Sequence, residues 1–178
     1  MTLKINQLNL KRSSSVCKNL TKELNELLQV KIELIFPDIW NIDYYNWFQD
    51  IEKYAFREEL RYSFKEVEER LNNAETLFFF ILVNNEPEIL MLGFLLPNKT
   101  KKIFFLDTVA VKHQNKGIGT IILKNLIKWL KKEGYNEIQL DTEEIDEKDI
   151  LLKKFYEKFG FELKERDVKG NLNMFLIL

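Results

Sequence analysis

The sequence has one cysteine and one histidine among 178 residues, Cys17 and His113. A single cysteine cannot form an intrachain disulfide, and the usual zinc sites need about three or four Cys and His ligands. The composition therefore excludes a disulfide-stabilised fold, and we expect no metal site. A hydrolase of the serine or papain type would require His113 to lie beside a nucleophile.

An excess of charge of one sign is also absent, since 27 Lys and Arg stand against 28 Asp and Glu, for a formal net charge of −1. A nucleic-acid-binding domain usually carries a basic excess or patch, so we expect no nucleic-acid partner. The longest apolar runs, residues 77–83 and 89–96, are far shorter than the ~20 residues of a membrane-spanning helix. Residues 1–28 lack the uninterrupted apolar segment of a secretory signal. We therefore expect a cytoplasmic protein without a membrane partner.

Hydrophobic residues make up 46% of the chain, enough at this length to bury the core of one domain. The leucines of residues 19–29 recur at helical spacing after a polar segment. We expect residues 1–28 to form an N-terminal helical extension and residues 29–178 to form the main domain. The sequence leaves open whether the extension covers part of the sheet or mediates a homodimer.

Hydrophobic periodicity predicts alternating strands and helices in the main domain. Period-two alternation and β-rich runs predict strands at residues 30–35, 77–83, 89–96, 103–111, 137–142, 161–168 and 172–178. Helical spacing and end signals predict helices from Pro37 to Phe56 and over residues 64–71, 117–132 and 149–159. Residues 84–88 are predicted to form a turn, and Ser63 with Glu66 is predicted to form a capping box.

The most informative stretch is residues 109–120, Val-Ala-Val-Lys-His-Gln-Asn-Lys-Gly-Ile-Gly-Thr, a buried strand that leads through a glycine-containing loop into a helix. Free amides at the positive end of a helix suit a phosphate or pyrophosphate, and Gly117 and Gly119 let a ligand approach the main chain. A Walker loop has four residues between its glycines, whereas only Ile118 separates Gly117 from Gly119 here. A Rossmann fingerprint has Gly or Ala at the position of Ile122. Both nucleotide motifs are excluded, whereas tight strand-to-helix packing without a ligand stays open.

Residues 114–119, Gln-Asn-Lys-Gly-Ile-Gly, resemble the Gln/Arg-x-x-Gly-x-Gly/Ala element of the GCN5-related N-acetyltransferase (GNAT) superfamily. Residues 109–111 resemble the family's fourth strand, and residues 155–161, Phe-Tyr-Glu-Lys-Phe-Gly-Phe, resemble the Tyr-x-x-x-Gly-Phe ending of its fourth helix. Residues 51–56 are similar to the first helix of ribosomal-protein-alanine acetyltransferases. The resemblance covers residues 29–178. It implies a single-domain α/β (α+β) fold with a central mixed, mostly antiparallel sheet of six to seven strands flanked by helices.

The resemblance implies an enzyme that transfers an acetyl group directly from acetyl-CoA to a primary amine in a ternary complex. The amine would be a small molecule or a protein N-terminus or lysine. Amides of the loop would hold the cofactor pyrophosphate, and main-chain groups of Val109 and Val111 would pair with the pantetheine arm. The implied cofactor-binding residues are Val109, Ala110, Val111, Gln114, Asn115, Lys116, Gly117, Ile118, Gly119 and Thr120.

The resemblance also implies that Tyr156 is the general acid for the leaving thiolate. Asp141 is the first candidate for the proton acceptor, followed by Asp107 and then by the pair Glu58 and Glu59, with water relays or structural roles left open. An alternative function is a catalytically silent module that senses coenzyme A or binds another protein. A nucleotide-binding protein is a third class.

Overall fold

The computed structural model of the chain describes residues 3–8, 14–73, 75–114, 116–146 and 148–178. Its strands are β1 (Leu3–Lys4), β2 (Ile32–Ile35), β3 (Ile39–Trp40), β4 (Thr76–Val83), β5 (Glu86–Leu96), β6 (Ile103–Val111), β7 (Glu137–Thr142), β8 (Glu162–Arg166) and β9 (Leu172–Ile177). Its helices are α1 (Ser14–Leu28), α2 (Ile42–Ala55), α3 (Phe64–Asn73), α4 (Ile118–Lys132) and α5 (Leu152–Glu157), with a 3₁₀ turn η2 (Glu58–Leu60). Among these helices, none is both long and apolar enough to cross a membrane.

Seven strands form one mixed sheet in the order β2-β4-β5-β6-β7-β9-β8, and every neighbouring pair is antiparallel except β6 and β7. Strands β1 and β3 form a separate two-stranded sheet. The arrangement confirms the predicted α/β fold, with a mostly antiparallel central sheet flanked by helices.

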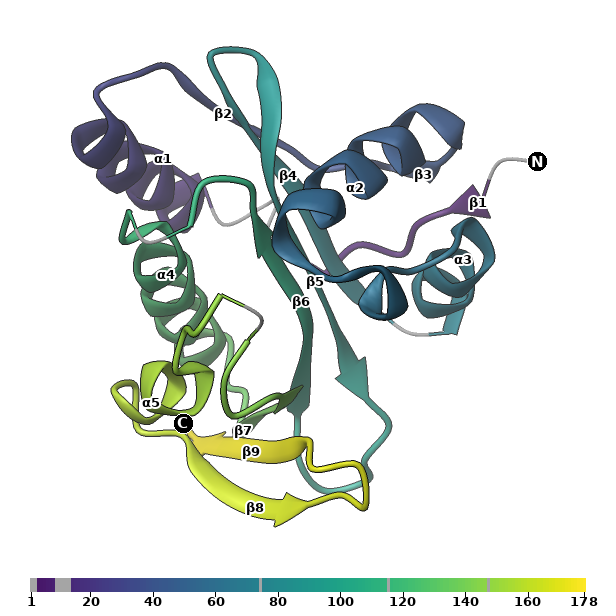
Figure 1. Cartoon of the computed structure of the whole chain (residues 1–178), viewed down its shortest axis with the longest axis vertical. Coiled ribbons are helices and arrows are strands. Elements are labelled where there is room, and N and C mark those ends of the chain that lie inside the picture. The colour runs from purple at the N-terminus through teal and green to yellow at the C-terminus, as the bar shows by residue number, and fades with distance from the viewer. Residues whose placement is uncertain (1–2, 9–13, 74, 115, 147) are drawn as a thin grey trace.

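Helices cover both faces of the sheet, with α1 and α4 on one face and α2 and α3 on the other (Figure 1). One hydrophobic cluster includes Trp129 of α4 and Phe104 of β6, and a second includes Trp40 and Phe48 on the α2 side. Strand β4 is buried along almost its whole length. Because both faces of the sheet are covered, β4 needs the continuous apolar run that the sequence shows.

The described part of residues 1–28 belongs to the same core. Leu20 and Leu24 of α1 are buried in the cluster that contains α4, and Glu23 accepts a hydrogen bond from Asn125 Nδ2 at 3.3 Å. Near the N-terminus, Gln7 Nε2 donates to Phe78 O at 2.8 Å, and Phe78 N–H donates to Gln7 Oε1 at 3.1 Å. These segments therefore cover part of the sheet.

The turn between β4 and β5 is shorter than predicted. The sequence predicts a turn over residues 84–88, but only Asn84 and Asn85 form it, with φ of 52° and 69°, and β5 begins at Glu86. Two-residue hairpin turns with positive φ at both positions match the twist of the strands, and asparagine tolerates that conformation. Strands β4 and β5 form an antiparallel hairpin as their sequence pattern indicates, and only the predicted length of the turn was wrong, because Glu86 and Pro87 pair with Val83 and Leu82.

Two helices begin later than predicted. The helix expected from Pro37 begins at Ile42, since β3 pairs with β1 and Asn41 Oδ1 caps the helix by accepting from Tyr44 N–H at 3.0 Å. The helix expected over residues 149–159 is confined to α5. There Asp146 Oδ1 accepts from the amides of Lys148 and Ile150 at 2.9 and 2.8 Å, so a turn precedes the helix.

The capping box predicted at the start of α3 is confirmed. Ser63 N–H donates to Glu66 Oε2 at 2.8 Å, and Glu66 N–H donates to Ser63 Oγ at 3.3 Å. We expect Ser63→Ala to lower the free energy of unfolding by about 1 kcal/mol, because it leaves a helix amide without its side-chain acceptor. Urea denaturation measures this change, and equal midpoints for the two proteins would show that the box does not stabilise α3.

Strands β6 and β7 diverge along their length. They pair only from Ile103–Phe105 with Glu137–Gln139. Beyond that point β6 carries a bulge at Asp107, where its register with β5 shifts, and β7 continues beside β9 alone. A bulge bends its strand and increases the local twist. The carboxyl-terminal halves of β6 and β7 therefore frame a gap within the sheet.

Candidate active site

Helix α4 starts on a glycine cap shortly after β6. Gly117 is the N-cap with φ of 77°, a left-handed conformation that glycine adopts without strain. Ile121 N–H donates to Gly117 O at 3.2 Å, so the amides of Ile118, Gly119 and Thr120 precede the first intrahelical bond. These amides lie at the positive end of the helix dipole, an arrangement that binds phosphate groups.

The main chain of β6 offers hydrogen-bonding groups to the gap between β6 and β7. Lys112 N–H donates to Glu88 O in the direction of β5 at 3.0 Å. Because hydrogen-bonding groups alternate between the two edges of a strand, those of Val109 and Val111 face the opposite edge, where β7 has moved away. This edge can accept an extended ligand as an added strand.

A cavity, which we call the loop cavity, connects this edge with the start of α4. Among the predicted cofactor-binding residues, those in its wall are Val109, Val111, Gln114, Gly117, Ile118, Gly119 and Thr120. Ala110 instead belongs to the hydrophobic cluster on the α2 side, and Lys116 lines a separate cavity beside Leu28. Asn115 lies outside the described residues.

A second cavity, which we call the acidic cavity, extends to α2. Its wall carries five carboxyl side chains: Glu52, Asp107, Asp141, Glu143 and Asp146. The described residues in this wall include neither Lys nor Arg. The two cavities share wall residues, namely Val109, Gln114, Asp146, Leu152 and Tyr156. Ligands in the two cavities would therefore meet at this junction.

Tyr156 of α5 lies at the junction of the two cavities. Its ring packs against Phe155 and Phe161, with ring centroids 5.2 and 5.6 Å apart. Burial raises the pKa of Tyr156 to about 12. The hydroxyl therefore stays protonated at neutral pH and can donate a hydrogen bond to a group bound at the junction.

Asp107, at the β6 bulge, is a buried and paired carboxylate. Its side chain is 7% exposed and lies 3.3 Å from Arg70 Nε, and it accepts a hydrogen bond from Thr108 Oγ1 at 2.9 Å. Burial raises the pKa of Asp107, although the charge of Arg70 acts in the opposite direction. Arg70 also lies over the ring of Tyr62, 3.9 Å from its centroid. Both oxygens of Asp107 thus have partners.

The other predicted proton acceptors differ in position. Asp141, at the end of β7, is exposed, lines the acidic cavity and accepts a hydrogen bond from Asn173 Nδ2 at 2.8 Å. Glu58 and Glu59 of η2 are exposed and lie outside the wall of that cavity. The structure therefore brings Asp141 and Asp107, but not this glutamate pair, to one cavity with Tyr156.

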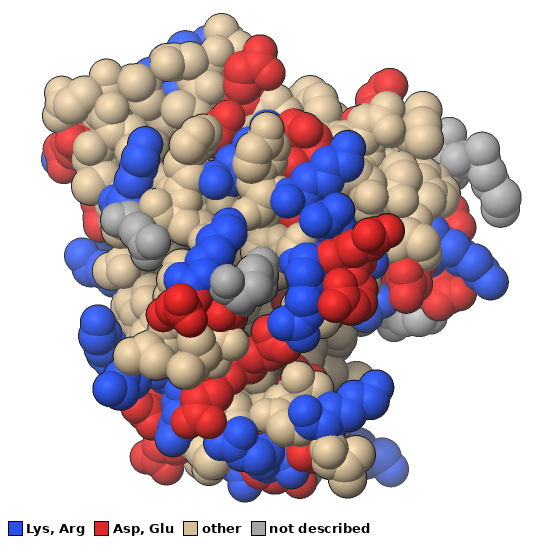
Figure 2. Space-filling view, viewed as in Figure 1, with Lys and Arg blue, Asp and Glu red and all other residues tan. Residues whose placement is uncertain are grey.

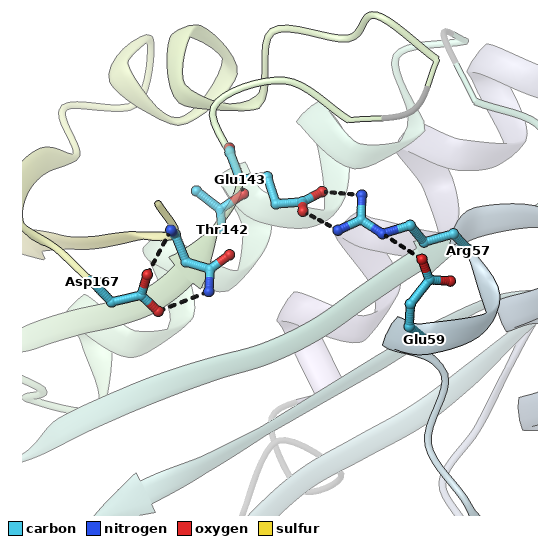
Figure 3. A network of polar contacts seen from close by, with 6 residues as sticks. Arg57, Glu59, Thr142, Glu143 and Asp167 are labelled. Atoms are coloured by element: carbon cyan, nitrogen blue, oxygen red, sulfur yellow. Dashed lines mark hydrogen bonds and ion pairs between the residues drawn. The ribbon is translucent and has the colours of Figure 1, made fainter. Parts of the chain in front are cut away.

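A charged bridge lies beside the acidic cavity (Figure 3). Arg57, between α2 and η2, donates through Nη1 to Glu143 Oε2 at 3.2 Å, and its Nη2 contacts Glu143 Oε1. Its Nε lies 3.6 Å from Glu59 Oε1. The bridge joins the segment after α2 to the segment after β7 and offsets the charge of Glu143 with that of Arg57.

Sequence reasoning missed Glu52 of α2. This residue is completely buried and lines the acidic cavity. The available signal was its spacing, since Glu52 follows Phe48 by four residues and precedes Ala55 by three, which places an acidic residue on the apolar face of the helix.

The outer surface carries charges of both signs. Figure 2 shows Lys and Arg interspersed with Asp and Glu over the viewed face, in keeping with a net charge of −1. The viewed face thus carries charges of both signs, whereas the described wall of the acidic cavity carries carboxyl groups without Lys or Arg.

Comparison with protein families gives a match to the acetyltransferase (GNAT) family over residues 41–161. This range includes β6, the loop before α4, and Tyr156. The chain belongs to the acetyltransferase (GNAT) family. The GNAT match confirms the resemblance carried by residues 114–119 and 155–161.

Solved structures of GNAT acetyltransferases share the fold at low sequence identity. The PaiA N-acetyltransferase of Thermoplasma acidophilum, in complex with coenzyme A, is 18% identical with a TM-score of 0.63, over 83% of this chain and 99% of that one. The ribosomal-protein-S18-alanine N-acetyltransferase of Escherichia coli is 18% identical with a TM-score of 0.63, over 82% of this chain and 93% of that one. Naa50 of Arabidopsis thaliana, in complex with the bisubstrate analogue CoA-Ac-MVNAL, is 18% identical with a TM-score of 0.61, over 82% of this chain and 97% of that one. None of the curated proteins compared matches the chain.

Proposed function

We propose that this GNAT protein is an acetyl-CoA-dependent N-acetyltransferase that moves the acetyl group directly to a primary amine in a ternary complex. The observation that carries the proposal is the junction of the loop cavity with the acidic cavity at Val109, Gln114 and Tyr156. A cofactor in one cavity and an amine in the other would bring the thioester and the nucleophile together at this junction. Such placement is itself a large part of catalysis.

The loop cavity has the features that coenzyme A requires. The amides of Ile118, Gly119 and Thr120 suit its pyrophosphate, and the free edge of β6 at Val109 and Val111 suits its amide-containing arm. When bound, acetyl-CoA supplies an acetyl group activated as a thioester. The coenzyme A complex of PaiA and the bisubstrate complex of Naa50 support this cofactor.

The acidic cavity has the features that an amine requires. Arg57 offsets the charge of Glu143 and Arg70 that of Asp107, which leaves Asp141 and Asp146 in its wall to attract a protonated amine. Two buried oxygens in its wall, Gln114 Oε1 and Glu52 Oε1, accept no hydrogen bond from the described residues. Because buried acceptors favour a donor as partner, an N–H group is the complementary ligand. The amine would belong to a small molecule, a protein N-terminus or a lysine.

Two proton transfers accompany the reaction, one from the amine and one to the departing sulfur, and different side chains near the junction can carry them out. A protonated amine has no free lone pair, so a carboxylate of the acidic cavity must take a proton before the nitrogen attacks. Asp141 and Asp107, the acceptors predicted from the sequence, both line this cavity. The Tyr156 hydroxyl donates to the departing sulfur.

Ligand-dependent thermal unfolding tests the proposal. At a concentration near 100 Kd, coenzyme A should stabilise the fold by about 2.7 kcal/mol, which raises the Tm by roughly 5–10 °C for a chain of this size. Acetyl-CoA should act similarly, whereas ATP and NAD should shift the Tm by less. A larger shift with ATP or NAD would instead favour a nucleotide-binding protein.

A further inference from the structure

Glu52 occupies a position that is unusual for a carboxyl group. It is 0% exposed and shares the buried face of α2 with Phe48, Ile51 and Ala55. Burying a carboxylate costs free energy unless hydrogen bonds or opposite charges compensate for the lost hydration. The hydrogen bonds and opposite charges around Glu52 therefore decide how readily its carboxylate takes up a proton.

The two oxygens of Glu52 have different environments. Oε2 accepts hydrogen bonds from Tyr62 N–H and Gln49 Nε2, each at 3.1 Å. Oε1 is buried and has no hydrogen-bond partner among the described residues. One oxygen thus fixes the side chain against the segment before α3, and the other is a buried acceptor without a partner, on a residue that lines the acidic cavity.

Few compensating charges surround Glu52. Arg61 lowers its pKa, whereas Asp107 of β6 and Glu66 of α3 raise it. The Tyr62 hydroxyl, Asp141 of β7, Glu143, Asp146 and Tyr156 of α5 are the other titratable groups lining the same cavity. Burial has the largest effect and raises the pKa of Glu52 to about 8. A base works best with a pKa near the working pH, which fits this value.

We infer that Glu52 is the catalytic proton acceptor that deprotonates the acceptor amine in the acidic cavity. This inference rests on the proposed acetyl transfer. Ionised Glu52 takes one N–H proton from the ammonium group, which leaves the nitrogen lone pair free to form the bond to the thioester carbonyl carbon. The carbon–sulfur bond breaks, the sulfur keeps its electron pair, and a second proton from the nitrogen reaches it through the Tyr156 hydroxyl. Glu52 then releases its proton to solvent.

Glu52 is better suited to this role than the two aspartates. Both oxygens of Asp107 are engaged, by Arg70 and by Thr108. Asp141 is exposed, and its Oδ1 already accepts a hydrogen bond from Asn173. Glu52 alone among these three combines complete burial with an unpartnered oxygen in the acidic cavity.

The test compares Glu52→Gln with Glu69→Gln, a matched change at an exposed glutamate of α3. With saturating acetyl-CoA and one fixed amine, we expect the kcat/KM of the wild type to rise through pH 8. Glu52→Gln should lower kcat about 100-fold and abolish this rise. Glu52→Asp should restore part of the activity and of the pH dependence. Glu69→Gln should behave as wild type.

Thermal stability without ligand separates this role from a purely structural one. Because the folded-state pKa of Glu52 lies above its ordinary value, its contribution to stability is complete at low pH and is lost as pH rises to about 8. Glutamine has no proton to lose, so the Tm of Glu52→Gln should exceed that of the wild type at pH 8 and approach it near pH 4.5. Coenzyme A should still bind to the variant.

The outcomes distinguish the inference from the proposed function. A folded Glu52→Gln variant that binds coenzyme A and keeps both wild-type kcat and the wild-type pH profile would overturn the role of Glu52 alone. A wild-type protein that acetylates no amine would overturn the proposed function itself. A variant that loses stability at every pH but keeps the wild-type kcat while folded would show that Glu52 serves only to hold α2 against Tyr62.

Discussion

Tyr156→Phe is expected to lower kcat about 100-fold while the Kd for coenzyme A changes by less than about twofold. The substitution keeps the ring packed against Phe155 and Phe161 and removes only the hydroxyl at the junction of the two cavities. Loss of the donor to the departing sulfur should slow the chemical step and leave ligand binding intact. Steady-state kinetics together with calorimetric titration of coenzyme A measure the two quantities separately.

Tyr135→Phe is the matched control for this prediction. Burial raises the pKa of Tyr135 to about 12 as well, but Tyr135 lines a different cavity, beside Trp129. Its substitution should leave kcat near the wild-type value. Because both tyrosines stay protonated up to high pH, Tyr156→Phe should lower activity by the same factor from pH 6 to pH 9. An unchanged kcat in Tyr156→Phe would remove this hydroxyl from the mechanism.

Gly119→Val is expected to weaken coenzyme A binding by about 10- to 100-fold. A Cβ at Gly119 would lie 3.5 Å from Phe155 Cζ, at the edge of ordinary contact, so larger branches must project into the loop cavity. There they block access to the first amides of α4. A lost charge-assisted hydrogen bond costs about 1.5–3 kcal/mol, which corresponds to this range of affinity.

Gly119→Ala provides the graded comparison, since its single methyl group fits without a close contact. It should weaken binding much less than Gly119→Val. Both substitutions lie within α4 and improve helix propensity, so the ligand-free protein should stay folded. Equal affinity in the valine variant and the wild type would show that the start of α4 does not contact the cofactor.

The glycine-containing loop between β6 and α4 could be predicted because its pattern is local in the sequence. A strand, a loop with Gly117 and Gly119, and an amphipathic helix follow one another within a few residues, and each leaves its own pattern. Gly117, the N-cap of α4, and Gly134, just past the end of that helix, have φ of 77° and 74°. Tyr156 was predicted from the resemblance of residues 155–161 to the GNAT family, and it lies in the wall of both cavities.

The acidic cavity could not be predicted because it depends on contacts between distant segments. The gap between β6 and β7 follows from the bulge at Asp107 and from the early end of the pairing after Phe105, which strand patterns do not reveal. Glu52 gains its importance only when α2 is packed against β6, with Asp107 nearby. Long-range packing, rather than local propensity, decides which carboxyl groups are buried together.

The measurement that tests the central claim most directly is acetyl transfer from acetyl-CoA to a panel of amines. The panel should contain peptides with free N-termini, lysine peptides, polyamines and amino sugars, with thiol release and product mass recorded together. We expect at least one amine to gain a single acetyl group with equal release of thiol, and Tyr156→Phe to slow both. Stabilisation by coenzyme A without acetylation of any amine would contradict the claim and would identify a silent coenzyme A-binding module.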